Sequence, residues 1–323
     1  MPYVTVGQKN GSSNGLYEEA RLRRTSRFLQ PERDLMKREH TTPVIAVRKM
    51  PLIWTAGIAA VVATAAALFA SSSAHAVSTK ARTDSAKPTI VLVHGAWADG
   101  SSFSPVTKRL QADGYTVDVP ANPLRGLASD SASIAAFLST ISGPIVLVGH
   151  SYGGAVITNA ALGNGQVKAL VYVDAFIPEK GDTLIGLTEK GSCFAAPPPD
   201  VFNFVPIPGA PDGVADTYVK PNLFPGCFAN GLPPRLGAEL AAAQRPLASN
   251  ALSEPSGEPA FDSGIPAWDV VGMNDHVITP HSQLAMAANA HAKVTEIDAP
   301  HLSMLAEPDA VTNVIEQAAK ATS

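Results

Sequence analysis

The chain has 323 residues, of which 46% are hydrophobic and 16% charged, with 27 Pro, 25 Gly and 2 Cys. This composition supports one large domain or two small ones, and it excludes both a disordered protein and a disulfide-built scaffold. Residues 77–323 hold 14 Lys and Arg against 23 Asp and Glu, a net charge of −9 with no basic cluster, which excludes nucleic acid as a partner.

A long apolar segment near the N-terminus has the features of a targeting signal. Residues 52–70 are apolar throughout, follow Arg48 and Lys49, and precede a small-residue A-x-A site that ends at Ala76. The pattern predicts a signal peptide over residues 50–76, cleaved after Ala76, so the mature protein is expected to be secreted or periplasmic. An uncleaved membrane anchor is the alternative, since about 19 apolar residues can span a bilayer.

The segments on either side of this signal are polar. We expect residues 1–49 to be disordered or, if translation begins at Met36 or Met50, to lie outside the translated protein. Residues 77–87 are expected to form a short linker between the signal and the folded domain.

From residue 88, short apolar runs alternate regularly with helical patterns. Strands are expected at residues 89–94, 115–119, 144–148, 169–173, 267–271 and 294–297. Helices are expected at residues 103–112, 131–141, 155–162, 236–244, 282–290 and 309–321. This alternation predicts an α/β fold, with a mostly parallel six-stranded sheet flanked by helices, built from residues 88–177 and 261–323.

Residues 178–260 interrupt this alternation. They hold 14 of the 27 prolines, both cysteines and one convincing helix, so they form either a cap over an active site or a disordered loop. Their aromatic residues favour a cap. In an exported protein the pair Cys193 and Cys227 is expected to form a disulfide, with two unpaired buried thiols as the alternative. Two cysteines without a nearby histidine are too few ligands for a metal site.

The segment Gly149-His150-Ser151-Tyr152-Gly153-Gly154 contains a G-x-S-x-G pattern between an expected strand and an expected helix. In this setting the serine is expected on a sharp, strained turn that lifts its hydroxyl above the sheet. Gly149 and Gly153 leave room for the crossing helix and strand, where a Cβ atom would collide. Ser151 is therefore the candidate nucleophile.

A serine nucleophile needs a base and an acid that orients the base. Asp275 follows the fifth expected strand and His301 follows the sixth. Because the carboxyl ends of parallel strands share one edge of the sheet, both side chains can meet Ser151 there. Asp174, at the end of the fourth strand, is the alternative acid.

The first strand ends in His94-Gly95-Ala96-Trp97. A bend there can point a main-chain N–H into the active site, so we expect the N–H groups of Ala96 and Tyr152 to form an oxyanion hole. His94 is expected to be a structural hydrogen-bonding residue near the site.

The motifs LVHGAW, GHSYGG, GMNDHVITP and APHLSML occur in this order, and together they resemble the α/β-hydrolase superfamily over about residues 88–320. Within it, the chain is similar to compact bacterial esterase-like hydrolases related to plant methyl-ester esterases and hydroxynitrile lyases. The resemblance implies a Ser-His-Asp enzyme that cleaves a small ester through an acyl-enzyme. The lyases carry a threonine where this chain has Gly95 and a lysine where it has Leu302, so lyase activity is disfavoured.

The expected function is therefore that of an exported serine hydrolase, similar to carboxylesterases, acting on a small apolar ester without a cofactor or metal. The alternatives are a catalytically weak ligand-binding homologue, a C–C or C–CN lyase, and a perhydrolase that uses the same three residues. The expected partner is a small-molecule ester, with membrane contact only through an uncleaved signal.

Overall fold

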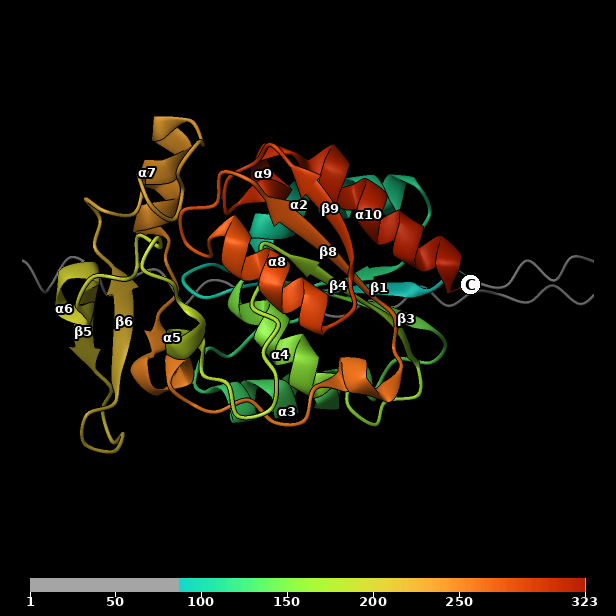
Figure 1. Ribbon diagram of the computed structural model, residues 1–323, viewed down its shortest axis with the longest axis horizontal. Helices are drawn as coiled ribbons and strands as arrows, with labels where there is room; N and C mark the ends of the chain where they lie inside the picture. Colours follow the sequence, from blue (N-terminus) through green and yellow to red (C-terminus); the bar gives the residue numbers. More distant parts are fainter. Residues whose placement is uncertain (1–86, 323) are drawn as a thin grey trace, which may run out of the picture. The chain divides into compact units, whose positions relative to one another are not determined.

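The computed structural model describes residues 87–322 (Figure 1). The expected N-terminal extension, the signal peptide and all but the last residue of the linker lie outside the described residues. Within residues 87–322, no helix is both long enough and apolar enough to cross a membrane.

A six-stranded parallel sheet forms the centre of the domain, in the order β2-β1-β3-β4-β8-β9. Its strands are β1 (Thr89–Val93), β2 (Val117–Asp118), β3 (Ile145–His150), β4 (Val167–Val173), β8 (Ala267–Gly272) and β9 (Lys293–Ile297). The predicted α/β fold is confirmed. The edge strand β2 is shorter than the expected span of residues 115–119.

Helices cover both faces of this sheet (Figure 1). One face carries α2 (Ser104–Ala112) and α10 (Pro308–Ala321), and the other carries α3 (Leu127–Leu138), α4 (Tyr152–Ala160) and α8 (Pro280–Asn289). Two short helices, η1 (Gly100–Phe103) and α9 (Ser303–Ala306), complete this part. Because both faces are covered, every residue of β3 is buried, which explains its continuous apolar run.

Residues 178–260, called the insertion below, separate β4 from β8. They form α5 (Leu184–Leu187), α6 (Pro198–Val201), β5 (Phe202–Pro206), β6 (Ala215–Val219), α7 (Pro234–Ala242), β7 (Leu247–Ala248) and η2 (Ser249–Leu252), and η3 (Ala260–Ser263) follows at the boundary. Strands β5, β6 and β7 make a separate antiparallel sheet. The helix expected at residues 236–244 corresponds to α7, but the strands and the short helices were not predicted. Four of the five β5 residues are exposed and leave no apolar run to recognise.

The insertion is packed against the core rather than extended into solvent. Its Phe224 and Phe228 are each only 1% exposed, and the indole N–H of Trp97 donates to the Thr217 carbonyl of β6 at 3.0 Å. A disulfide joins Cys193 to Cys227 within the insertion, with the two Cα atoms 5.8 Å apart. The insertion therefore has a defined position beside the loop that carries Trp97.

Candidate active site

Ser151 sits on the turn between β3 and α4 with φ 53° and ψ −123°, a conformation that L residues rarely adopt. Two glycines allow this turn. A Cβ atom on Gly149 would lie 2.5 Å from the Gly153 carbonyl oxygen, and one on Gly153 would overlap the Val93 carbonyl oxygen of β1. The close approach of helix to strands fixes where the serine hydroxyl lies.

His301 connects Ser151 to Asp275. The His301 Nε2 atom lies 3.1 Å from the Ser151 Oγ atom, and the Nδ1–H group donates to Asp275 Oδ2 at 2.8 Å. The side chains of His301 and Asp275 are fully buried. With its proton on Nδ1, the imidazole has a free electron pair at Nε2 that can accept the serine proton.

The Asp275 carboxylate is held by further donors. Its Oδ1 atom accepts the backbone N–H groups of Val277 at 2.7 Å and Ile278 at 3.0 Å, and its Oδ2 atom accepts Gln283 Nε2 at 2.8 Å. Burial raises the pKa of Asp275, and these hydrogen bonds act in the opposite direction. Sequence reasoning missed Gln283. It is fully buried on α8, eight residues after the aspartate, but nothing in its local pattern marks it.

Asp174, the alternative acid, does not hydrogen-bond to His301. Its carboxylate accepts the N–H groups of Gly272 at 2.9 Å and Ser303 at 3.3 Å, so it ties β4 to the following loops. Burial, followed by the nearby Asp275 carboxylate, raises the pKa of Asp174. The structure thus brings Asp275, and not Asp174, to the imidazole.

Two further histidines surround the site. His94 Nε2 accepts the Asn122 backbone N–H at 3.1 Å, and the opposite ring nitrogen donates to the Gly95 carbonyl at 2.9 Å. His150 Nε2–H donates to the His301 carbonyl at 2.9 Å, and the two rings lie 4.8 Å apart. Burial lowers the pKa of both rings, so they stay neutral. His150 therefore supports the backbone of His301, a contact that sequence reasoning did not identify.

The expected oxyanion donors, Ala96 and Tyr152, line the same pocket as Ser151. Among residues 87–322, no acceptor is found for the backbone N–H of either residue. The Tyr152 hydroxyl donates to Asp130 at 2.7 Å, which anchors this side chain below the turn. Both backbone groups therefore remain the candidate oxyanion donors.

The pocket above Ser151 has a volume of about 560 Å³. Its walls are mainly apolar and come from both the core and the insertion; they include Trp97, Phe176, Ile185, Phe194, Phe202 and Phe204. Trp97 stacks on Phe202 at 5.0 Å and meets the edge of Phe194 at 5.3 Å. Among the described residues, Lys190 is the one charged residue that lines the pocket, so the cavity suits a bulky, apolar ligand.

Residues 87–322 contain no group of three or more His, Cys, Asp or Glu side chains placed to hold a metal ion. The described polar residues of the site are instead joined to one another and to backbone groups by hydrogen bonds.

A nucleophile turn, a buried His-Asp pair and a sheet of this order define an α/β hydrolase. The family model of the alpha/beta hydrolase family matches residues 90–314, and the chain belongs to this family. The resemblance drawn from the four motifs is confirmed.

Individual relatives include esterases and hydrolases of similar sequence or fold. The carbendazim hydrolyzing esterase of Nocardioides sp. (strain SG-4G) is 36% identical over 124 residues, which cover 34% of this chain and about half, 49%, of that protein. A pyrethroid hydrolase from Sphingobium faniae JZ-2 is similar in structure, with a TM-score of 0.56 and 21% identity over 72% of this chain and 98% of its own. The methylesterase MES16 from Arabidopsis has a TM-score of 0.58 and 16% identity over 72% and 99% of the two chains. At these identities, the two structures show a shared fold.

Proposed function

We propose that this protein is a serine hydrolase that cleaves carboxylic esters through an acyl-enzyme. The observation that carries the proposal is the hydrogen-bonded series from Ser151 through His301 to Asp275, at 3.1 Å and 2.8 Å. The relatives called esterases and hydrolases support the same reaction class.

In the first half of the reaction, Ser151 Oγ attacks the ester carbonyl carbon while His301 Nε2 takes the hydroxyl proton. Asp275 stabilises the resulting imidazolium ion. The carbonyl oxygen gains negative charge, which the N–H groups of Ala96 and Tyr152 stabilise. The tetrahedral intermediate then releases the alcohol, which leaves with the proton from His301.

In the second half, water attacks the acyl-enzyme. His301 accepts a proton from this water, the new C–O bond forms, and the bond from the acyl carbon to Ser151 Oγ breaks. Ser151 recovers its proton, and the carboxylic acid leaves.

The pocket supports a substrate with a bulky apolar or aromatic group. A cavity of about 560 Å³ is within the range of sites that enclose a whole small molecule, and it carries four aromatic rings from the insertion and the Trp97 loop. We propose that the insertion acts as the cap that forms this cavity, because Phe194, Phe202 and Phe204 all belong to it.

Ser151→Ala tests the reaction. We expect kcat for an activated aryl ester to fall at least about 10⁴-fold, while the folded state is kept. The wild-type protein should release a burst of phenol equal to its own concentration, and the variant should release none. Ser139→Ala, which removes an exposed hydroxyl bonded to the Ala136 carbonyl, is the matched control and should retain the burst. Ester turnover that survives in Ser151→Ala would contradict the proposal.

We also propose that the protein is exported. The apolar run at residues 52–70 and the A-x-A site that ends at Ala76 support this, and a disulfide between Cys193 and Cys227 suits an oxidising compartment. Mass spectrometry of the native protein should find an N-terminus at Val77 in the culture medium or periplasm. A chain that keeps residues 52–70 and stays in the membrane fraction would show an anchor instead.

A further inference from the structure

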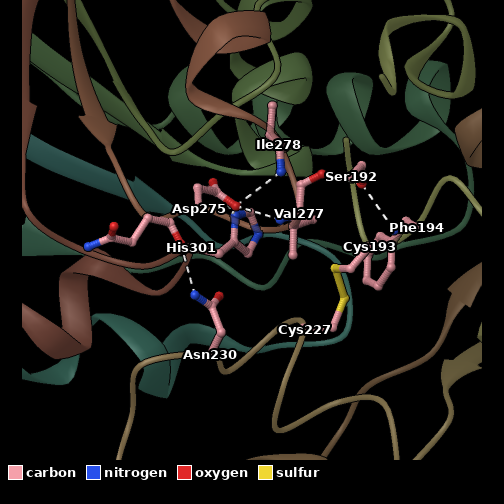
Figure 2. The surroundings of a disulfide bond; sticks show 10 residues. Ser192, Cys193, Phe194, Cys227, Asn230, Asp275, Val277, Ile278 and His301 are labelled. Atoms are coloured by element: carbon pink, nitrogen blue, oxygen red, sulfur yellow. Dashed lines mark hydrogen bonds and ion pairs between the residues drawn. A yellow bond between two sulfur atoms is a disulfide. The ribbon is translucent and has the colours of Figure 1, made fainter. Parts of the chain in front are cut away.

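Three hydrogen bonds from the insertion hold the loop that carries Asp275. Figure 2 shows Ser192, Cys193 and Asn230 beside Asp275. Each donor bonds a backbone carbonyl within two residues of the aspartate. The bonds are Asn230 Nδ2 to the Asn274 oxygen at 2.8 Å, the Cys193 N–H to the His276 oxygen at 2.8 Å, and Ser192 Oγ to the Val277 oxygen at 2.6 Å. The loop is therefore hydrogen-bonded to the insertion on both sides of Asp275.

These donors come from two segments of the insertion that the disulfide joins. One segment contains Ser192 and Cys193, and the other contains Cys227 and Asn230. The cysteines are 34 residues apart in sequence, yet both of their segments contact the loop that carries Asp275 (Figure 2). Apart from the disulfide, the described residues of the two segments meet through the stacked rings of Phe194 and Phe228, whose centres are 6.4 Å apart.

The Cys227 segment also contacts His301 and the residue before it. The Phe228 ring meets the imidazole edge-on, with ring centres 5.0 Å apart. Gly231, with φ 75°, lies so close to Pro300 that an added Cβ atom would be 3.2 Å from the proline ring. The Cys227 segment thus contacts both His301 and the loop that carries Asp275.

Ser192 and Asn230 have no direct route to a substrate. Both are buried, at 7% and 8% exposure, and neither lines the pocket above Ser151. The Ser192 hydroxyl and the Asn230 amide each donate to a backbone carbonyl of the Asp275 loop, whereas an apolar side chain would suffice for packing. Any effect on chemistry must act through the position of Asp275.

We propose that Ser192 and Asn230 are positioning residues for Asp275, and that the Cys193–Cys227 disulfide holds them as one unit. The inference rests on the proposed hydrolase function, because it assigns these residues to the alignment of the Asp275–His301 pair. A shift of the loop weakens the 2.8 Å bond that fixes the imidazole. Small misplacements of catalytic groups cost up to about 10²-fold in rate, so a single lost bond should lower kcat about 10-fold.

The test uses the full-length chain and compares matched variants. Asn230→Ala and Ser192→Ala should each lower kcat about 10-fold and leave KM within about twofold, since the pocket is untouched. Ser192→Thr keeps the hydroxyl donor and should recover most of kcat. Gln244→Ala is the control, because Gln244 also donates its amide N–H to a carbonyl within the insertion, that of Val219 at 2.9 Å. Burst titration counts the functional sites, so a poorly folded fraction does not distort kcat.

The downfield proton resonance of the His301 Nδ1–H group gives a readout that needs no substrate. Asn230→Ala and Ser192→Ala should shift or broaden this resonance, and Gln244→Ala should leave it unchanged. The inference is overturned if the resonance and kcat match the wild type in both variants, or if Gln244→Ala has the same effects. If Ser151→Ala retains ester turnover, the hydrolase proposal fails, whereas the resonance still decides whether these residues position Asp275.

Discussion

Asp275→Asn should abolish most of the activity by forcing the imidazole of His301 into the wrong tautomer. The change hardly alters the size of the side chain, but it replaces one acceptor oxygen with an NH₂ group. Two backbone donors, the N–H groups of Val277 and Ile278, face the Oδ1 position at 2.7 Å and 3.0 Å. The amide oxygen must occupy that position, so the NH₂ group must face His301.

The consequence for the base follows from the 2.8 Å distance between Asp275 Oδ2 and His301 Nδ1. Two N–H groups cannot face each other at this separation, so the imidazole must carry its proton on Nε2 instead. That proton points at Ser151 Oγ, and the ring can no longer accept the serine proton. A base in the wrong tautomer costs about 10⁴-fold in kcat, which corresponds to about 5.5 kcal/mol of transition-state stabilisation.

Steady-state turnover of an activated aryl ester measures this effect, and Asp174→Asn is the matched control. Asp174 is equally buried, but its carboxylate accepts N–H groups from Gly272 and Ser303 and makes no hydrogen bond to His301. Its variant should stay within about 10-fold of the wild-type kcat. The reasoning is refuted if Asp275→Asn keeps more than about a tenth of the wild-type kcat, or if Asp174→Asn loses as much as Asp275→Asn.

Three further predictions concern pH and packing. Burial lowers the pKa of His301, and the base must be neutral, so kcat/KM should fall only as pH drops below about 6.5; a midpoint above that value in the pH profile would contradict this. Gly153→Ala should lower the free energy of unfolding by at least about 2 kcal/mol in urea titrations, because its Cβ atom would overlap the Val93 carbonyl, while Gly165→Ala, with no atom within 4 Å, should not. Both carboxylate oxygens of Asp269 are buried without a hydrogen-bond partner among the described residues, and burial raises the pKa of Asp269. The folded protein therefore keeps this carboxyl group protonated, whereas the unfolded chain ionises it above about pH 3.9, so the wild type loses stability as pH rises. The free energy of unfolding of Asp269→Asn should therefore increase relative to that of the wild type, by up to about 1.4 kcal/mol per pH unit. An equal difference between the two proteins at pH 4 and pH 7 would exclude this cause.

The centre of the sheet was predictable because its inner strands are covered on both faces. Burial on both sides requires consecutive apolar residues, so β3 and β4 are legible from the sequence alone. The active-site loops follow directly from that, since they come where the parallel strands end. Helix boundaries were less legible. Helix α4 begins at Tyr152, whereas residue 155 was expected. The prediction began too late because Gly153 and Gly154 are poor helix formers. These glycines lie in the helix because strand and helix approach each other closely there.

The insertion was harder to read because its residues find their partners far away in the sequence. In β5, the buried Phe202 is followed by four exposed residues, so no alternation distinguishes the strand from a loop. Its pairing with β6 depends on the core surface beneath, where Trp97 stacks on Phe202. The local sequence indicates where the turns of the insertion lie, but it does not indicate which surface of the core they pack against.

The same limit explains why Asn230 and Gln283 escaped notice although Asp275 did not. Asp275 follows a strand at a fixed place in the fold, so position alone made it a candidate. Asn230 precedes a glycine, and that dipeptide predicts only a turn, which the φ of 75° at Gly231 matches. Its amide contacts Asn274, which lies 44 residues further along the chain. A residue that supports a catalytic group through the backbone leaves no local signature, so such supports become visible only when the loops are placed in three dimensions.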